Sequence, residues 1–119
     1  MGWELRYDRG KGFRFFSTIT MSYISGWLKT PDNVGRFAYE TGLEHARRHL
    51  ATAPNAGVVR TSTGGLGLGY WGLGSPRSDL DRTPEDYGRY LARYWSAEAK
   101  KELKRVGKYP DLTTYGWRE

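Results

Sequence analysis

The sequence has no cysteine, little apolar content and no long apolar run, and these absences exclude several classes of protein. Without cysteine the chain forms no disulfides and no thiolate metal sites, whichever compartment it occupies. No apolar stretch approaches the roughly 20 residues that a transmembrane helix needs. The N-terminal stretch MGWELRYDRGKG alternates apolar and charged side chains, which is not typical of a signal peptide. We therefore expect synthesis in the cytosol and no membrane partner.

The low apolar content limits the stability that a lone domain can reach. At 119 residues the chain predicts a single domain with one modest core. Only 38% of the residues are hydrophobic and the mean hydropathy is -0.73, while an aromatic fraction of 15% supplies rings for a small core and for contacts. We expect such a chain to gain stability from an oligomer or a larger assembly.

Residues 1–29 predict a strand region followed by a short helix. The segment Trp3–Tyr7 alternates apolar and charged residues, as a half-buried strand does. Arg9–Gly12 is typical of a turn, and residues 13–19 form either a second strand or the approach to a helix. The helix is expected to end near Lys29. Its prediction depends on the helical spacing of Ile24, Trp27 and Leu28.

Two long helices are predicted over residues 30–53 and 83–107. The first begins at Thr30-Pro31-Asp32 and the second at Thr83-Pro84-Glu85. In each, the threonine caps the helix, the proline suits the first turn and the carboxylate favours the positive end of the helix dipole. Pro54 stops the first helix, and a glycine followed by a proline ends the second.

Two glycines lie inside the first predicted helix, at positions 35 and 42. Each weakens the helix by about 1 kcal/mol relative to alanine, so Gly35 and Gly42 indicate close packing against a neighbouring element. The last residues, 108–119, have no clear period and are expected to form a tail.

Residues 57–74 combine the β-branched stretch GVVRTST with the glycine-rich run GGLGLGYWGLG. Gly67–Gly72 fits the pattern G-x-G-x-x-G, but a dinucleotide site needs a helix directly after the glycine turn, and no helical pattern begins before Thr83. The segment therefore predicts no cofactor site. Two interpretations remain: a strand packed over its own core, or an interface arm that docks on a neighbouring subunit. The contact residues of the arm would be Leu66, Leu68, Tyr70, Trp71 and Leu73.

The residue types that commonly carry catalysis or bind metals form no complete site. His45 and His49 share a helix face, but a zinc site needs a third ligand, and two arginines lie between the histidines. The carboxylate pairs fit turn and capping roles, and no serine lies in a nucleophile motif. We predict no catalytic residues, no metal and no cofactor.

A basic cluster lies near the end of the second predicted helix. The net charge is +6 and the pI is about 9.7, which suits nucleic acid or an acidic protein surface as partner and selects neither. We interpret the cluster as a basic contact face for DNA phosphates or for an acidic neighbour in a ring; the alternative is a solvated helix face. The face consists of Lys100, Lys101, Lys104 and Arg105.

The helix GRFAYETGLEHARRHLATAP, running into NAGVVRTST, resembles the small neck and tail-completion proteins of long-tailed phages. Those proteins typically have a long helix ending in Ala-Pro, a short turn with glycine, and a strand with Arg and Ser. The likeness covers about residues 1–75, and the chain departs from the pattern at Ala56, where the family has Thr. The matching residues are Ala53, Pro54, Gly57, Arg60 and Ser62.

The resemblance implies an α+β fold, with a small antiparallel sheet packed against one or two long helices in a single domain. It also implies a structural virion protein, made in the host cytoplasm, that forms a ring at the head–tail junction or tail end and catalyses nothing. The implied partners are copies of the chain itself, neighbouring connector and tail proteins, and packaged DNA. The alternative hypothesis is a small basic nucleic-acid-binding or regulatory module.

Overall fold

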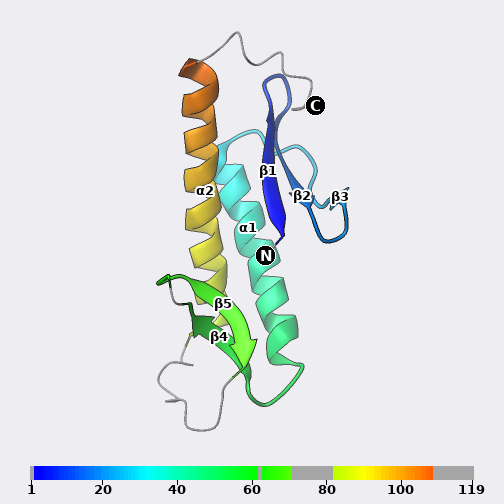
Figure 1. Ribbon diagram of the computed structural model, residues 1–119, viewed down its shortest axis with the longest axis vertical. Helices are drawn as coiled ribbons and strands as arrows, with labels where there is room; N and C mark the ends of the chain where they lie inside the picture. Colours follow the sequence, from blue (N-terminus) through cyan, green and yellow to red (C-terminus); the bar gives the residue numbers. More distant parts are fainter. Residues whose placement is uncertain (1, 62, 71–81, 109–119) are drawn as a thin grey trace. The chain divides into compact units, whose positions relative to one another are not determined.

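The computed structural model describes residues 2–61, 63–70 and 82–108. Two antiparallel sheets and two long helices make up these residues, which confirms the predicted α+β class (Figure 1). The elements in chain order are β1 (Trp3–Asp8), β2 (Gly12–Ser17), β3 (Ser22–Tyr23), α1 (Pro31–Leu50), β4 (Ala56–Arg60), β5 (Leu66–Tyr70) and α2 (Pro84–Lys108).

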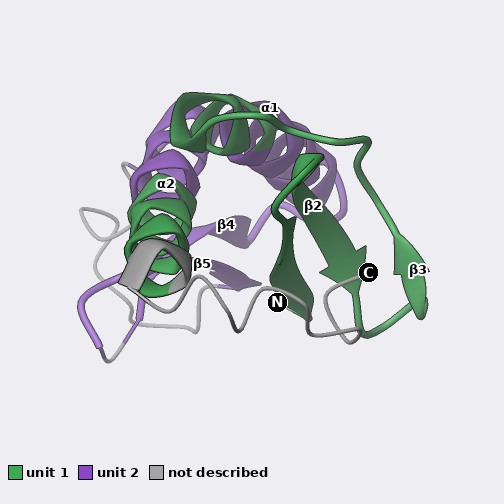
Figure 2. Ribbon diagram, turned by 90° about the horizontal axis from the view of Figure 1, so that it is seen from above, with its two compact units in different colours: residues 1–37, 94–119 green, residues 38–93 purple. Residues whose placement is uncertain are grey.

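The chain divides into two compact units, and both helices contribute to both of them (Figure 2). The first unit, residues 1–37 and 94–119, holds the β1-β2-β3 sheet, the start of α1 and the second half of α2. The second unit, residues 38–93, holds the β4-β5 hairpin, the rest of α1 and the start of α2.

The core of the first unit is an aromatic cluster on one face of its sheet. In the antiparallel register of β1 and β2, Trp3 pairs with Ser17 and Leu5 with Phe15, so alternate side chains share a face. Phe15 is fully buried there, with its ring 5.3 Å from that of Trp3 and 5.2 Å from those of Phe37 on α1 and Trp95 on α2. Helix and sheet are therefore joined by ring packing, worth about 0.5–1.5 kcal/mol per pair beyond area burial.

The predicted short helix ending near Lys29 is wrong, because this segment runs beside β2 instead. The backbone N–H of Ile24 donates to the carbonyl of Phe15 at 3.0 Å, and that of Leu28 donates to the carbonyl of Phe13 at 2.7 Å. Ser25 Oγ also accepts from the N–H of Phe15 at 2.9 Å. Pairing with a strand distant in sequence thus overrides a helical spacing of apolar residues.

The long helices confirm the two predicted start signals. Thr30 Oγ1 accepts from the backbone N–H of Asn33 at 3.1 Å, and Thr83 Oγ1 accepts from that of Asp86 at 3.1 Å. The N–H of Thr83 donates back to the carboxylate of Asp86 at 3.0 Å, which completes a capping box. α1 ends at Leu50, whereas the position of Pro54 had predicted a helix that ends at Ala53.

In the second unit, α1 and α2 approach closely at two glycines. A Cβ added to Gly42 would lie 2.6 Å from Leu91 Cδ1, and one added to Gly88 would lie 2.9 Å from the backbone carbonyl oxygen of Tyr39. The close packing expected of Gly42 is therefore confirmed, with Gly88 as its counterpart on α2.

The hairpin of β4 and β5 explains the alternating glycines. Its turn closes with the N–H of Thr61 donating to the carbonyl of Gly65 at 2.9 Å, and Gly64 has a φ of +87°, which favours glycine. A Cβ on Gly69 would lie 3.0 Å from Val59, and Gly65 lies directly against the ring of Tyr90. Side chains of the chain itself thus contact Gly69 in β5 and Gly65 just before it.

Candidate interaction surface

The turn between β2 and β3, residues 18–21, carries two large apolar side chains in solvent. Ile19 is 80% exposed and Met21 is 70% exposed. Met21 also has a φ of 55°, a left-handed conformation that is unusual for a residue other than glycine. We call these four residues the hairpin tip.

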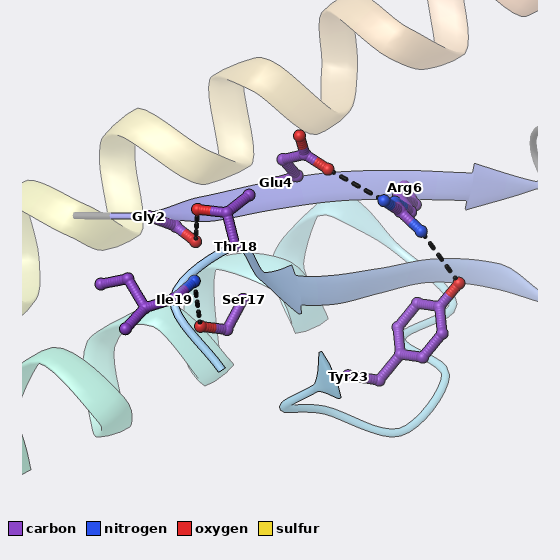
Figure 3. Close-up of polar contacts among 7 residues, drawn as sticks. All are labelled: Gly2, Glu4, Arg6, Ser17, Thr18, Ile19 and Tyr23. Atoms are coloured by element: carbon purple, nitrogen blue, oxygen red, sulfur yellow. Dashed lines mark hydrogen bonds and ion pairs between the residues drawn. The ribbon is translucent and has the colours of Figure 1, made fainter. Parts of the chain in front are cut away.

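Polar contacts hold the hairpin tip in one shape. The hydroxyl of buried Ser17 accepts from the backbone N–H groups of Ile19 and Thr20, at 3.3 and 3.2 Å. Thr18 ties the tip to the start of the chain, because its N–H and its hydroxyl both donate to the carbonyl of Gly2, at 2.7 and 2.9 Å (Figure 3). The exposed side chains are therefore presented by an ordered turn, which lowers the entropy cost of binding.

Beside the tip, the outer face of the sheet alternates cations with rings. The guanidinium of Arg6 lies 4.0 Å from the ring centre of Phe16, and that of Arg14 lies 3.8 Å from Tyr23 and 5.0 Å from Trp27. Each such contact is worth about 0.5–1 kcal/mol at an exposed site. Arginine and aromatic residues are also the types enriched at the centres of protein interfaces.

Arg6 is held by two further groups on this face. Its terminal nitrogens donate to the hydroxyl of Tyr23 at 3.3 Å and to the carboxylate of Glu4 at 3.0 Å (Figure 3). The bond to Tyr23 and the bond and charge of Glu4 raise the pKa of Arg6. By contrast, Arg14 has no ion pair within the described residues, and its Nε donates to the backbone carbonyl of Ser25 at 3.3 Å.

A groove of about 670 Å³ lies between β1 and the second half of α2, inside the first unit. Aromatic and apolar side chains line it together with acidic ones, and we call it the β1–α2 groove. Within the described residues, the buried Nε1 of Trp95 has no hydrogen-bond partner. The lining residues are Trp3, Glu4, Leu5, Arg6, Tyr94, Trp95, Glu98 and Glu102.

Charge is distributed unevenly between the hairpin and the groove. Residues 9–29 contain no Asp or Glu. Their basic residues are Arg9, Lys11, Arg14 and Lys29. The groove lining contains Glu4, Glu98 and Glu102, and each of these forms an ion pair, with Arg6, Lys101 and Arg105 respectively.

In the predicted basic contact face the three lysines are exposed, Arg105 is half-buried, and part of the charge is neutralised by glutamates. Lys101 pairs with Glu98 at 3.4 Å, and Arg105 pairs with Glu102 at 2.6 Å. Lys100 and Lys104 are exposed and have no ion pair among the residues that the structure describes. These two lysines, four residues apart on one helix face, are the part of the basic face that stays available to a partner.

The described part of the predicted interface arm belongs to β5. Leu66 and Leu68 are half-buried and pair with Arg60 and Val58 of β4, while Tyr70 is 59% exposed. Pairing within the chain therefore orders this strand without a neighbouring subunit. Contact with such a subunit stays a prediction for Tyr70, and the arm residues Trp71 and Leu73 lie outside the described residues.

The two histidines of α1 form no metal site with their described surroundings. His49 Nε2 lies 2.7 Å from the carbonyl oxygen of Gly69, and its ring packs edge-on against Tyr70 at 4.8 Å. The described residues include no group of three potential metal ligands. His49 thus links α1 to the glycine-rich strand.

The residues of the family-like motif lie at the end of α1 and along β4. Gly57 is buried in β4 and Arg60 is exposed at its end, whereas Ala53 and Pro54 precede the strand. Ser62 lies outside the described residues.

Sequence reasoning missed both the hairpin tip and the β1–α2 groove. The tip had a signal, because Ile19 and Met21 alternate with threonine and serine in a segment without acidic residues. The groove had none, since it joins residues about ninety positions apart.

No family model, curated protein or solved structure matches this chain. Neither helix, over its described residues, is long and apolar enough to cross a membrane.

Proposed function

We propose that this chain is a structural subunit of a ring at the head–tail junction, or at the tail end, of a long-tailed phage particle. The observation that carries the proposal is the hairpin tip, whose ordered turn presents Ile19 and Met21 to solvent. Two large apolar side chains on a fixed turn contribute little to the stability of a lone chain. They contribute a great deal once another protein surface covers them.

Two further features support an assembly role. The α+β class agrees with the fold that the resemblance to neck and tail-completion proteins implies. The low apolar content is also suited to a subunit that gains stability from neighbours. The subunit catalyses nothing, and its partners are other copies of itself and the adjoining connector and tail proteins.

A small basic nucleic-acid-binding module is the second candidate. Exposed Lys100 and Lys104, without an ion pair in the described part of the chain, favour it. A titration of the purified chain with duplex DNA at two salt concentrations separates the candidates. The nucleic-acid module is favoured if the lone chain binds duplex DNA tightly, if the affinity falls steeply as salt is raised, and if Lys100→Glu/Lys104→Glu abolishes the binding.

Quantitative mass spectrometry of purified tailed particles tests the structural proposal. We expect the chain in every preparation, at a fixed ring-like copy number relative to the portal protein. Particles made without the chain should accumulate as unjoined heads and tails. Complete infectious particles that lack the chain would refute the proposal.

A further inference from the structure

We infer that the outer face of the β1-β2-β3 sheet binds single-stranded nucleic acid, with Trp27 stacking on a base and with Arg14 and Lys11 contacting phosphates. All three residues belong to the first unit. The inference goes beyond the proposed function and does not depend on it, because the face it concerns is distinct from the hairpin tip.

Cations and rings alternate in one continuous row along this face. Each cation lies over the ring before it and, except for the last cation, over the ring after it. The distances between cation and ring centre run from 3.8 to 5.7 Å. The row consists, in order, of Phe16, Arg6, Tyr23, Arg14, Trp27 and Lys11. Cations that are held in place before a ligand arrives lose less entropy when it binds.

Arg14 is the arginine of the row whose donors stay available to a ligand. Its Nε donates to the carbonyl of Ser25 at 3.3 Å, and its two terminal nitrogens have no acceptor among the described residues. Those nitrogens reach solvent, because in the same part of the chain Nε1 of Trp95 is the one buried side-chain polar atom without a partner. Arg6, by contrast, donates to the hydroxyl of Tyr23 (Figure 3). Arg14 therefore presents a positioned guanidinium fork of the kind that binds phosphate oxygens.

The charge around this fork favours an anion. Arg14 and the exposed Lys11 form no ion pair within the described ranges. Residues 9–29 contain four basic residues and no acid, a formal charge of +4. Asp8 is the acid that precedes this segment, and its carboxylate accepts from the backbone N–H of Gly10 at 3.1 Å. An anionic ligand would relieve the repulsion among these cations.

The ring of Trp27 favours a single strand over other anions. Trp27 is 38% exposed and lies next to both cations. An exposed ring that stacks on a base, beside cations that follow the phosphates, is how proteins bind single strands with little regard to sequence. The carboxylates of an acidic protein would gain little from the ring. In a duplex the faces of the bases are covered by their neighbours, so only an unpaired base can stack on Trp27.

A titration with a fluorescein-labelled single strand of about 15 thymidines, followed by fluorescence anisotropy at several salt concentrations, tests the site. Trp27→Ala should weaken binding about tenfold without changing the salt dependence, and Trp27→Phe, which keeps a ring, should retain most of the affinity. Arg14→Gln/Lys11→Gln should also weaken binding about tenfold, and should reduce the slope of log affinity against log salt by about 1.4, because two phosphate contacts are lost.

Arg36→Gln is the matched control, since it removes one exposed positive charge from α1 within the first unit. It should change the affinity less than about twofold and leave the slope nearly unchanged. Far-ultraviolet circular dichroism checks that each variant is folded. If the double variant unfolds, Lys11→Gln alone serves, with an expected slope change of about 0.7.

Competition experiments decide between ligand classes. An unlabelled duplex of the same length and polyglutamate should each compete at least about tenfold less well than the unlabelled single strand. Equal competition by polyglutamate would overturn the inference and assign the face to an acidic protein surface. Equal competition by the duplex would also overturn it, because no stacked base would then be involved.

The remaining outcomes separate this site from the other functions considered. A wild type that does not bind the single strand, or a Trp27→Ala variant with unchanged affinity, would overturn the inference. Binding that only Lys100→Glu/Lys104→Glu abolishes would overturn it too and place the nucleic acid on α2. The mass spectrometry of tailed particles is independent of all these results, so the structural function and the binding site can each fail while the other stands.

Discussion

Gly88→Ala should destabilise the protein, although alanine is the better helix former. A Cβ at position 88 would lie 2.9 Å from the carbonyl oxygen of Tyr39, which is backbone and has no rotamer to change. The substitution gains about 1 kcal/mol in helix propensity. Forcing a methyl group into a filled contact costs about 1–3 kcal/mol. We expect a net loss near 1 kcal/mol in the free energy of unfolding, and a melting temperature lower by about 4 °C.

Urea denaturation followed by circular dichroism measures this loss. Ala97→Gly is the matched control, because Ala97 lies at an exposed position of the same helix and its replacement reports propensity alone. That control should lose about 1 kcal/mol. If Gly88→Ala instead gains what Ala97→Gly loses, the helices have room for a methyl group at position 88 and the reasoning is refuted.

Three further predictions concern the cap, the core and the arm. Hydrogen bonds from the N–H of Thr83 and then from Arg89 lower the pKa of Asp86 below its ordinary value of 3.8, so this carboxylate stabilises the folded chain above the unfolded pKa and the contribution is lost as the pH falls through the lowered pKa. Asp86→Asn should therefore reduce the loss of unfolding free energy that the wild type shows as the pH falls below about 4, and an unchanged acid profile would contradict this. Phe15→Ala should lower the free energy of unfolding, measured by urea denaturation, by about 3–5 kcal/mol, because it removes the ring against which three other rings pack. A loss below about 1 kcal/mol would show that the cluster is loosely packed. Tyr70→Ser should change the unfolding free energy by less than about 0.5 kcal/mol, since the side chain is mostly exposed, and a larger loss would mean that its contact with His49 matters to the fold.

Local chemistry allowed the helices to be predicted from the sequence. Thr30 and Thr83 cap their helices with nearby backbone groups, so the signal and its effect lie within one turn. Gly42 was informative for a similar reason, because a glycine inside a helix costs stability and is explained by a neighbour close to the backbone.

The remaining features depend on contacts between residues far apart in sequence. Ile24 and Leu28 have helical spacing, yet their backbone groups bond to β2, and nothing local to that segment indicates the pairing. The β1–α2 groove likewise exists only once Trp3 and Glu98 are brought together by the fold. The sequence left the glycine-rich run open between a strand packed over its own core and an interface arm, because the neighbours of Gly65 and Gly69, Tyr90 and Val59, could not be inferred from spacing.

Site-specific labelling tests most directly whether another protein covers the hairpin tip, because the chain has no cysteine of its own. Met21→Cys places a thiol on the tip, and Ala97→Cys places one at an exposed position of α2. In the lone chain a maleimide should label both variants, whereas in tailed particles it should label Ala97→Cys and spare Met21→Cys. Equal labelling of the two variants in particles would contradict the account.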